Sequence, residues 1–178
     1  MKIVVVTIAL ISAAVGLASC DKNAAADTKT DKNAITVAIK NDVHDLVTEL
    51  NAKDVDKAAA HDAADYVGMF HGAPNSVGLE ADKTTTKQVV ADPLFWVTLG
   101  NETVDVAQAG DMAIYRTSYQ YRYTGKNKKE AKESGNWVIG YKKQADGTWK
   151  VAWNVISDTG PSAAEAPAAQ AKPEAKKS

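Results

Sequence analysis

The hydrophobic period of this chain changes at Pro93, and that change limits the folds open to it. Before Pro93, apolar residues recur at steps of three and four, which is the period of an amphipathic helix. After Pro93, apolar and polar residues alternate, which is the period of a strand with one buried face. Helices followed by a run of strands predict an α+β domain whose helices cover one face of the sheet.

Three helices are expected before Pro93. The second begins at an Asp54 N-cap and continues through Ala60, and the third runs from near Asp82 to Ala91. The first is long, with Asn33 as its candidate N-cap. One face of this first helix carries Ile35, Ile39, Val43, Leu46, Val47 and Leu50.

Turn sequences divide the second half of the chain into four strands. The turns are expected at Ala109–Asp111, Gly125–Ser134 and Ala145–Gly147, which predicts an antiparallel meander. A shorter strand is expected earlier, from Tyr66 to Phe70.

The first residues have the pattern of an export signal. Lys2 is followed by an uncharged run, Ile3–Leu17, which is shorter than the ~20 apolar residues that span a bilayer. Leu17-Ala18-Ser19-Cys20 closes the run and resembles the bacterial lipobox. That resemblance implies that residues 1–19 are a signal peptide and that Cys20 carries lipid holding the protein to a membrane. The alternative is an ordinary signal peptide that leaves a free thiol.

Cys20 is the single cysteine of the chain, so its domain must be held together without an internal disulfide. A lone cysteine at that place suits a lipid anchor in the bacterial cell envelope. Asp21 follows it, and an aspartate there resembles the signal that retains lipoproteins in the inner membrane, facing the periplasm.

Composition separates one domain from two polar ends. Residues 20–33 are expected to be the lipidated cysteine with a flexible tether, and residues 161–178 a disordered tail of Ala, Pro and Lys. Residues 34–160 then form the domain. Removing the signal leaves 20 basic and 22 acidic residues, a balance that does not favour nucleic acid as a partner.

Several segments of the domain together resemble a known superfamily. Leu50–Asp54 leads into Ala63–Asp65, Gly78 precedes the third helix, and Asp146–Val151 forms the last turn and strand. In this order they resemble SnoaL-like and ketosteroid-isomerase-like domains of the nuclear transport factor 2-like superfamily. The resemblance implies a cone-shaped, curved antiparallel sheet wrapped around the long helix, with two further short helices and a pocket at the open end.

The resemblance also permits a test for catalysis. Ketosteroid isomerase uses an aspartate base opposite a tyrosine and a protonated aspartate. The resemblance places Leu46, Phe70 and Ile139 at these positions, and all three are apolar. Steroid isomerisation by that mechanism is therefore not expected. No catalytic residue, cofactor or metal ligand is predicted, since His61, Asp62 and Asp65 lack a third strong ligand and His44 and His61 lie at polar helix positions.

Alternating aromatic residues indicate a ligand pocket. Tyr115, Tyr119, Tyr121 and Tyr123 share one face of a strand, and Trp137, Ile139 and Tyr141 share a face of the next. These rings either form core or, nearer the open end, meet a ligand. The expected ligand-binding residues are Tyr115, Tyr119, Trp137, His71 and Asn154.

The last strand has two possible orientations. Trp149, Val151, Trp153 and Val155 form its apolar face, whereas the family register turns Ala152, Asn154 and Ile156 inward. In the second case an apolar stripe faces outward and suits a homodimer through the sheet.

Three functions remain open. The first is a noncatalytic, membrane-anchored domain that binds a small apolar or aromatic ligand or a protein partner. The second is an isomerase, cyclase or dehydratase that uses His71 or Asn154 with the pocket tyrosines. The third is a purely structural, dimeric envelope protein.

Overall fold

The computed structural model describes residues 30–159, which form a six-stranded sheet and three helices. The signal sequence, Cys20, Asp21 and the tail lie outside the described residues. The strand order is β2-β1-β6-β5-β4-β3. The helices are α1 (Lys32–Asn51), α2 (Val55–Ala60) and α3 (Leu79–Val90); the strands are β1 (Asp62–Phe70), β2 (Ser76–Val77), β3 (Trp96–Val106), β4 (Met112–Thr124), β5 (Glu130–Lys143) and β6 (Trp149–Asp158).

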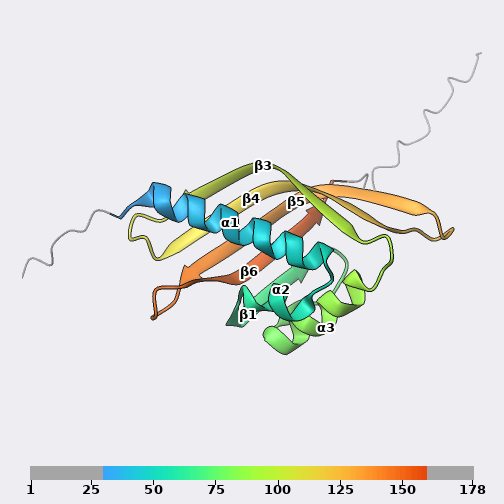
Figure 1. The fold of residues 1–178 in the computed structure, drawn as a ribbon, viewed down its shortest axis with the longest axis horizontal. Helices are drawn as coiled ribbons and strands as arrows, with labels where there is room; N and C mark the ends of the chain where they lie inside the picture. Colours follow the sequence, from blue (N-terminus) through green and yellow to red (C-terminus); the bar gives the residue numbers. More distant parts are fainter. Residues whose placement is uncertain (1–29, 160–178) are drawn as a thin grey trace, which may run out of the picture.

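The α+β fold class is confirmed, with a curved sheet, a long N-terminal helix and two shorter helices. Figure 1 shows α1 lying across the sheet, with α2 and α3 together beside β1. Among residues 30–159, no helix combines the length and apolar character needed to cross a membrane.

The apolar face of α1 is the predicted one. Ile39 and Val43 are fully buried, and they pack in one core cluster with Tyr115, Ile139 and Tyr141 of the sheet. The predicted N-cap is wrong: the Asp31 carboxylate accepts hydrogen bonds from the amides of Asn33 and Ala34. Asp31 precedes the first helical residue, so its side chain reaches amides that Asn33, already inside the helix, cannot serve.

The two short helices differ in how well their starts are predicted. Asp54 caps α2 by accepting from the Lys57 amide, as expected. Helix α3 begins at Leu79, earlier than predicted, after Gly78 at a φ of 82°. A residue with a side chain is strained at that φ, so glycine makes the earlier start possible. The earlier start places Asp82 in the first turn of α3, with its side chain buried.

The predicted four-strand meander is confirmed as β3 to β6. The earlier strand, β1, is longer than Tyr66–Phe70 and pairs parallel with β6, while β2 pairs antiparallel with β1. Every other pairing in the sheet is antiparallel.

An irregularity in β6 resolves the two orientations of that strand. Tyr141 pairs with Val151 and Gly140 pairs with Trp153, so Ala152 is an extra residue between the pairs. A bulge of this kind reverses which side chains face the core. Trp149 and Val151 therefore join the core, while Asn154 and Ile156 take the inner face beyond the bulge.

The outer face of β6 carries the remaining part of the apolar stripe. Trp153 and Val155 are half-buried there, and the Trp153 indole packs over Gly140, where an added Cβ would approach the ring to 2.1 Å. The same face of the sheet carries Ile114 on β4 and Val77 on β2, which are 36% and 68% exposed. A homodimer through this face stays a prediction.

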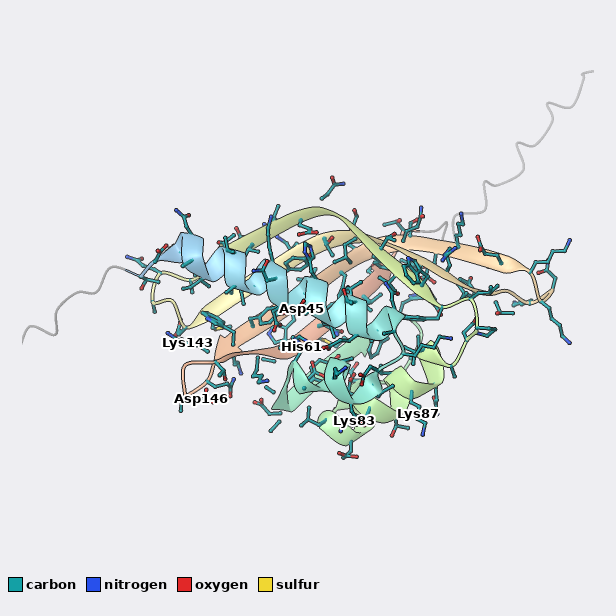
Figure 2. The ribbon with its side chains drawn as sticks, in the orientation of Figure 1. Asp45, His61, Lys83, Lys87, Lys143 and Asp146 are labelled. Carbon is teal, nitrogen blue, oxygen red and sulfur yellow. The ribbon has the colours of Figure 1, made fainter. Side chains whose placement is uncertain are left out.

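His61 links α1 to the end of α2, where Figure 2 shows it between the two helices. Its Nδ1 lies 2.8 Å from an Asp42 oxygen and its Nε2 lies 2.9 Å from a Glu49 oxygen. The hydrogen bond to Asp42 raises the pKa of His61 most, and Glu49 adds to the rise. His61 is therefore not an exposed residue on a polar helix face, because α1 brings two carboxylates to it and its side chain is 13% exposed.

Candidate ligand-binding cavity

A cavity of about 800 Å³ lies between α3, the C-terminal part of α1 and the inner face of the sheet. Leu46 and Leu50 of α1 line one side of it, and Val90 of α3 another. Tyr119 and Trp137 line it from β4 and β5. This volume is in the range of small-molecule sites, and the contributing side chains are mainly apolar or aromatic.

The cavity lies at one end of the sheet because α1 covers the other end. The Lys32 ammonium at the start of α1 donates to the Val106 carbonyl, and the Asn51 amide at its end donates to the Val97 carbonyl. Tyr115 pairs with Val104, under the N-terminal half of α1, and Tyr121 pairs with Val97, under its end. Beyond Asn51 the chain turns into α2, which leaves this part of the sheet for the cavity.

The prediction for Tyr115 is therefore corrected. Its side chain is fully buried in the core and does not line the cavity, because α1 packs directly against that part of β4. Tyr119, four residues further along the strand, lines the cavity and donates a short hydrogen bond from its hydroxyl to the Glu133 carboxylate. Burial, more than Glu133, raises the pKa of the Tyr119 hydroxyl above its ordinary value.

Trp137 and Asn154 line the cavity from adjacent strands. The Trp137 side chain is 6% exposed and Asn154 is 8% exposed. Trp137 Nε1 and Asn154 Oδ1 are buried without a hydrogen-bond partner among the described residues. Buried polar atoms in proteins are nearly always paired, so one unpaired donor and one unpaired acceptor at a cavity wall are features of a site that receives a ligand.

His71 lies at the rim of the cavity. Its side chain is 73% exposed, and its Nδ1 is 3.8 Å from an Asp158 oxygen. That distance is too long for a hydrogen bond. His71 is therefore largely exposed to solvent, and no described residue forms a buried polar pair with it.

A group of polar side chains from three elements, β6, β1 and α3, lines one part of the cavity. Asn154 Nδ2 donates to the Tyr66 hydroxyl over 2.7 Å, and Asp82 lines the cavity beside Tyr66 and influences the ionisation of that hydroxyl. Thr86 Oγ1 donates to Asp82, over 3.3 Å. The carboxyl groups of Asp62 and Asp82 both line the cavity, and each influences the ionisation of the other. We call Asp62 and Asp82 the carboxyl pair.

The carboxyl pair retains a proton near neutral pH. Burial, followed by the charge of Asp82, raises the pKa of Asp62 to about 8, against the smaller opposing effects of His61 and Lys150. Burial also raises the pKa of Asp82, although the Tyr66 and Thr86 hydroxyls oppose the rise. Because Asp82 receives these donors and lies in the first turn of α3, it is the better anion, and Asp62 holds the proton.

Sequence reasoning missed this group for two reasons. Asp82 was expected at the start of α3, where a carboxylate is an ordinary cap. The strand is expected to begin at Tyr66, so Asp62 is not placed on it, although residues four apart on a strand share a face. The sequence does contain one sign of this group. Asp82, Thr86 and Val90 are spaced four residues apart, so the carboxylate shares a helix face with a buried valine.

The structure places the three apolar residues that the resemblance puts at the catalytic positions of ketosteroid isomerase in the interior of the domain. Leu46 and Phe70 line the cavity, and Ile139 is fully buried. Within residues 30–159, no group of three or more His, Cys, Asp and Glu side chains is arranged to hold a metal ion.

Comparison with known proteins finds likeness in structure rather than in sequence. No protein-family model matches the chain, and no curated protein matches it. A ketosteroid isomerase-like protein from Erwinia carotovora atroseptica is 20% identical, with a TM-score of 0.62 over 72% of this chain and 99% of that one.

Two proteins from Novosphingobium have similar structures. An NTF2-like protein with a cystatin-like fold from N. aromaticivorans is 17% identical, with a TM-score of 0.58 over 71% of this chain and 82% of that one. The hexachlorocyclohexane dehydrochlorinase LinA-type3 from N. barchaimii is 15% identical, with a TM-score of 0.61 over 69% of this chain and 88% of that one. At these identities the likeness shows the fold alone, and that fold is the cone of NTF2-like and ketosteroid isomerase-like proteins.

Proposed function

We propose that this protein binds a small, largely apolar molecule in the cavity between α1, α3 and the sheet. The observation that carries the proposal is the cavity itself, at about 800 Å³, with Trp137 Nε1 and Asn154 Oδ1 unpaired at its wall. An apolar body would bury the aromatic and aliphatic side chains, and one acceptor and one donor on the ligand would pair with the two polar atoms. The apolar Leu46 and Phe70 support binding rather than ketosteroid isomerase chemistry.

A cavity-filling substitution tests ligand binding. Val97 lines the cavity, so Val97→Trp should occupy much of its volume and weaken binding of N-phenylnaphthylamine, a neutral apolar fluorophore, by at least about 10-fold. Val138→Trp is the matched control, because Val138 pairs with Val155 on the outer face. The proposal fails if the wild-type protein does not bind the fluorophore, or if both tryptophan variants bind it as the wild type does.

We further propose that the domain acts at a bacterial membrane, held there by lipid on Cys20. Support comes from the Leu17-Ala18-Ser19-Cys20 sequence and the lack of any other cysteine. In a lipoprotein-processing bacterium, radioactive palmitate should label the wild-type protein, and Cys20→Ala should abolish the label and release the protein from the membrane fraction. Cys20→Ala protein that remains labelled would contradict the anchor.

A further inference from the structure

The cavity wall carries negative but no strongly basic side chains. Asp62, Asp82 and Glu133 line the cavity, whereas no Lys or Arg among the described residues does. Among the residues that line the cavity, His71 is the one with a side chain that can carry a positive charge, and it lies at the exposed rim. A buried wall of this composition repels an anionic ligand and attracts a cation, because charges interact more strongly where water is excluded.

The polar end of the cavity offers acceptors to a ligand. Asn154 donates from Nδ2 to the Tyr66 hydroxyl, which leaves Oδ1 as an acceptor with no partner among the described residues. Asn154 as a whole is 8% exposed. The carboxyl pair lines the same cavity as Asn154 and Tyr66. An ammonium group has three donors, an alcohol has one and a carboxylate has none, so an ammonium suits this set of acceptors best.

From this arrangement we propose that the cavity takes a protonated organic amine with an apolar body, and that Asp62 and Asp82 are its counter-ion. The inference rests on the proposed ligand-binding function and adds the chemical class of the ligand. The body lies against Phe95, Tyr121 and Trp137, whose ring faces also attract a cation. The ammonium donates to Asn154 Oδ1 and to the carboxyl pair.

Binding of the amine displaces the proton that the carboxyl pair holds. An adjacent positive charge favours ionisation of both carboxyl groups, so the pair changes from one negative charge to two. The other groups that face Asp62 are His61 at the end of α2, Lys150 on β6 and Tyr66 on β1. These groups belong to the protein, and the new charge in the cavity is that of the ligand. We therefore expect the released proton to come from the carboxyl pair.

Three ligands with one ring system distinguish this class from others. Tryptamine carries an ammonium, tryptophol a hydroxyl and indoleacetate a carboxylate on the same indole. Calorimetry on the Cys20→Ala chain should show tryptamine binding on the order of 10-fold to 100-fold more tightly than tryptophol, and indoleacetate binding least. At neutral pH, tryptamine binding should release close to one proton, measured as the difference in heat between phosphate and Tris buffers.

Variants locate the counter-ion. The Asp62→Asn/Asp82→Asn double variant should reduce tryptamine affinity to that of tryptophol and abolish proton release, while tryptophol affinity stays unchanged. Asp62→Asn alone keeps the Asp82 anion, so it should abolish proton release and lose less tryptamine affinity than the double variant. Asp146→Asn is the matched control, because Asp146 lies at the turn between β5 and β6, away from the cavity (Figure 2). Circular dichroism and the melting temperature confirm that each variant is folded.

The possible results separate the two proposals. Equal binding of tryptamine and tryptophol would overturn the amine inference and leave the apolar cavity intact. A tryptamine preference that survives the double carboxyl variant would also overturn it, because the attraction would then come from elsewhere. Failure of all three indoles, with N-phenylnaphthylamine still bound, would reject the amine class and leave the ligand-binding function standing.

Discussion

Asp62→Asn is expected to stabilise the protein, by about 1 to 3 kcal/mol at about pH 8. The folded chain retains a proton on the carboxyl pair that the unfolded chain releases above about pH 4, because folding raises the pKa of Asp62 to about 8. The free energy of unfolding of the wild type therefore falls as pH rises from about 4 to about 8. An asparagine has no charge to bury, so the variant should lose most of this dependence.

Urea unfolding across that pH range measures the effect. Asp65→Asn is the matched control, because Asp65 lies on the same strand with an exposed side chain and should change stability by less than about 0.5 kcal/mol. A wild-type stability that is flat from about pH 4 to about pH 8, or an Asp62→Asn variant that is less stable at about pH 8, would contradict a carboxyl pair that retains a proton in the folded protein.

Gly135→Ala is expected to destabilise the protein by about 2 to 4 kcal/mol. Gly135 pairs with Tyr119 across β4 and β5, and the Tyr119 ring lies over it. An added Cβ would come within 2.3 Å of the Ser157 carbonyl oxygen and 2.6 Å of the Tyr119 ring. The backbone of β6 cannot move without breaking strand pairing, and Tyr119 cannot move without changing the cavity wall.

Gly100→Ala provides the comparison on a neighbouring strand. Its added Cβ would meet only the Ser118 hydroxyl oxygen, at 3.3 Å, and that side chain can rotate away. We expect a loss below about 1 kcal/mol for this variant in the same urea experiment. Equal losses for the two alanine variants would show that the close contact at Gly135 is not what requires glycine there.

Local sequence patterns were enough to predict the elements that are marked by regular spacing of apolar residues or by turn residues. The face of α1, the Asp54 cap of α2 and the meander from β3 to β6 all follow from spacing and turn residues. The parallel pairing of β1 with β6 was not accessible in this way, because it joins segments separated by most of the domain. The bulge at Ala152 was likewise hidden, although the conflict between two apolar patterns in β6 was its signal.

The cavity was predicted in part. Tyr119, Trp137, His71 and Asn154 line it, and an aromatic alternation was enough to select the correct face of the sheet. Tyr115 was misplaced because alternation identifies a face and not how far a helix covers that face. The carboxyl pair depends on the start of α3 and on the extension of β1 back to Asp62, where it pairs with β6, and both are decided by tertiary contacts.

The proposed binding of an amine depends on one property of the carboxyl pair. The pair must hold a proton that a ligand cation displaces. Carbon-detected NMR of the Asp62 and Asp82 carboxyl groups, followed against pH with and without tryptamine, tests it most directly. We expect Asp62 to remain protonated at neutral pH, to titrate near pH 8, and to ionise at neutral pH when tryptamine is added. Two carboxyl groups that both titrate near their ordinary values of about 4, unaffected by the amine, would contradict it.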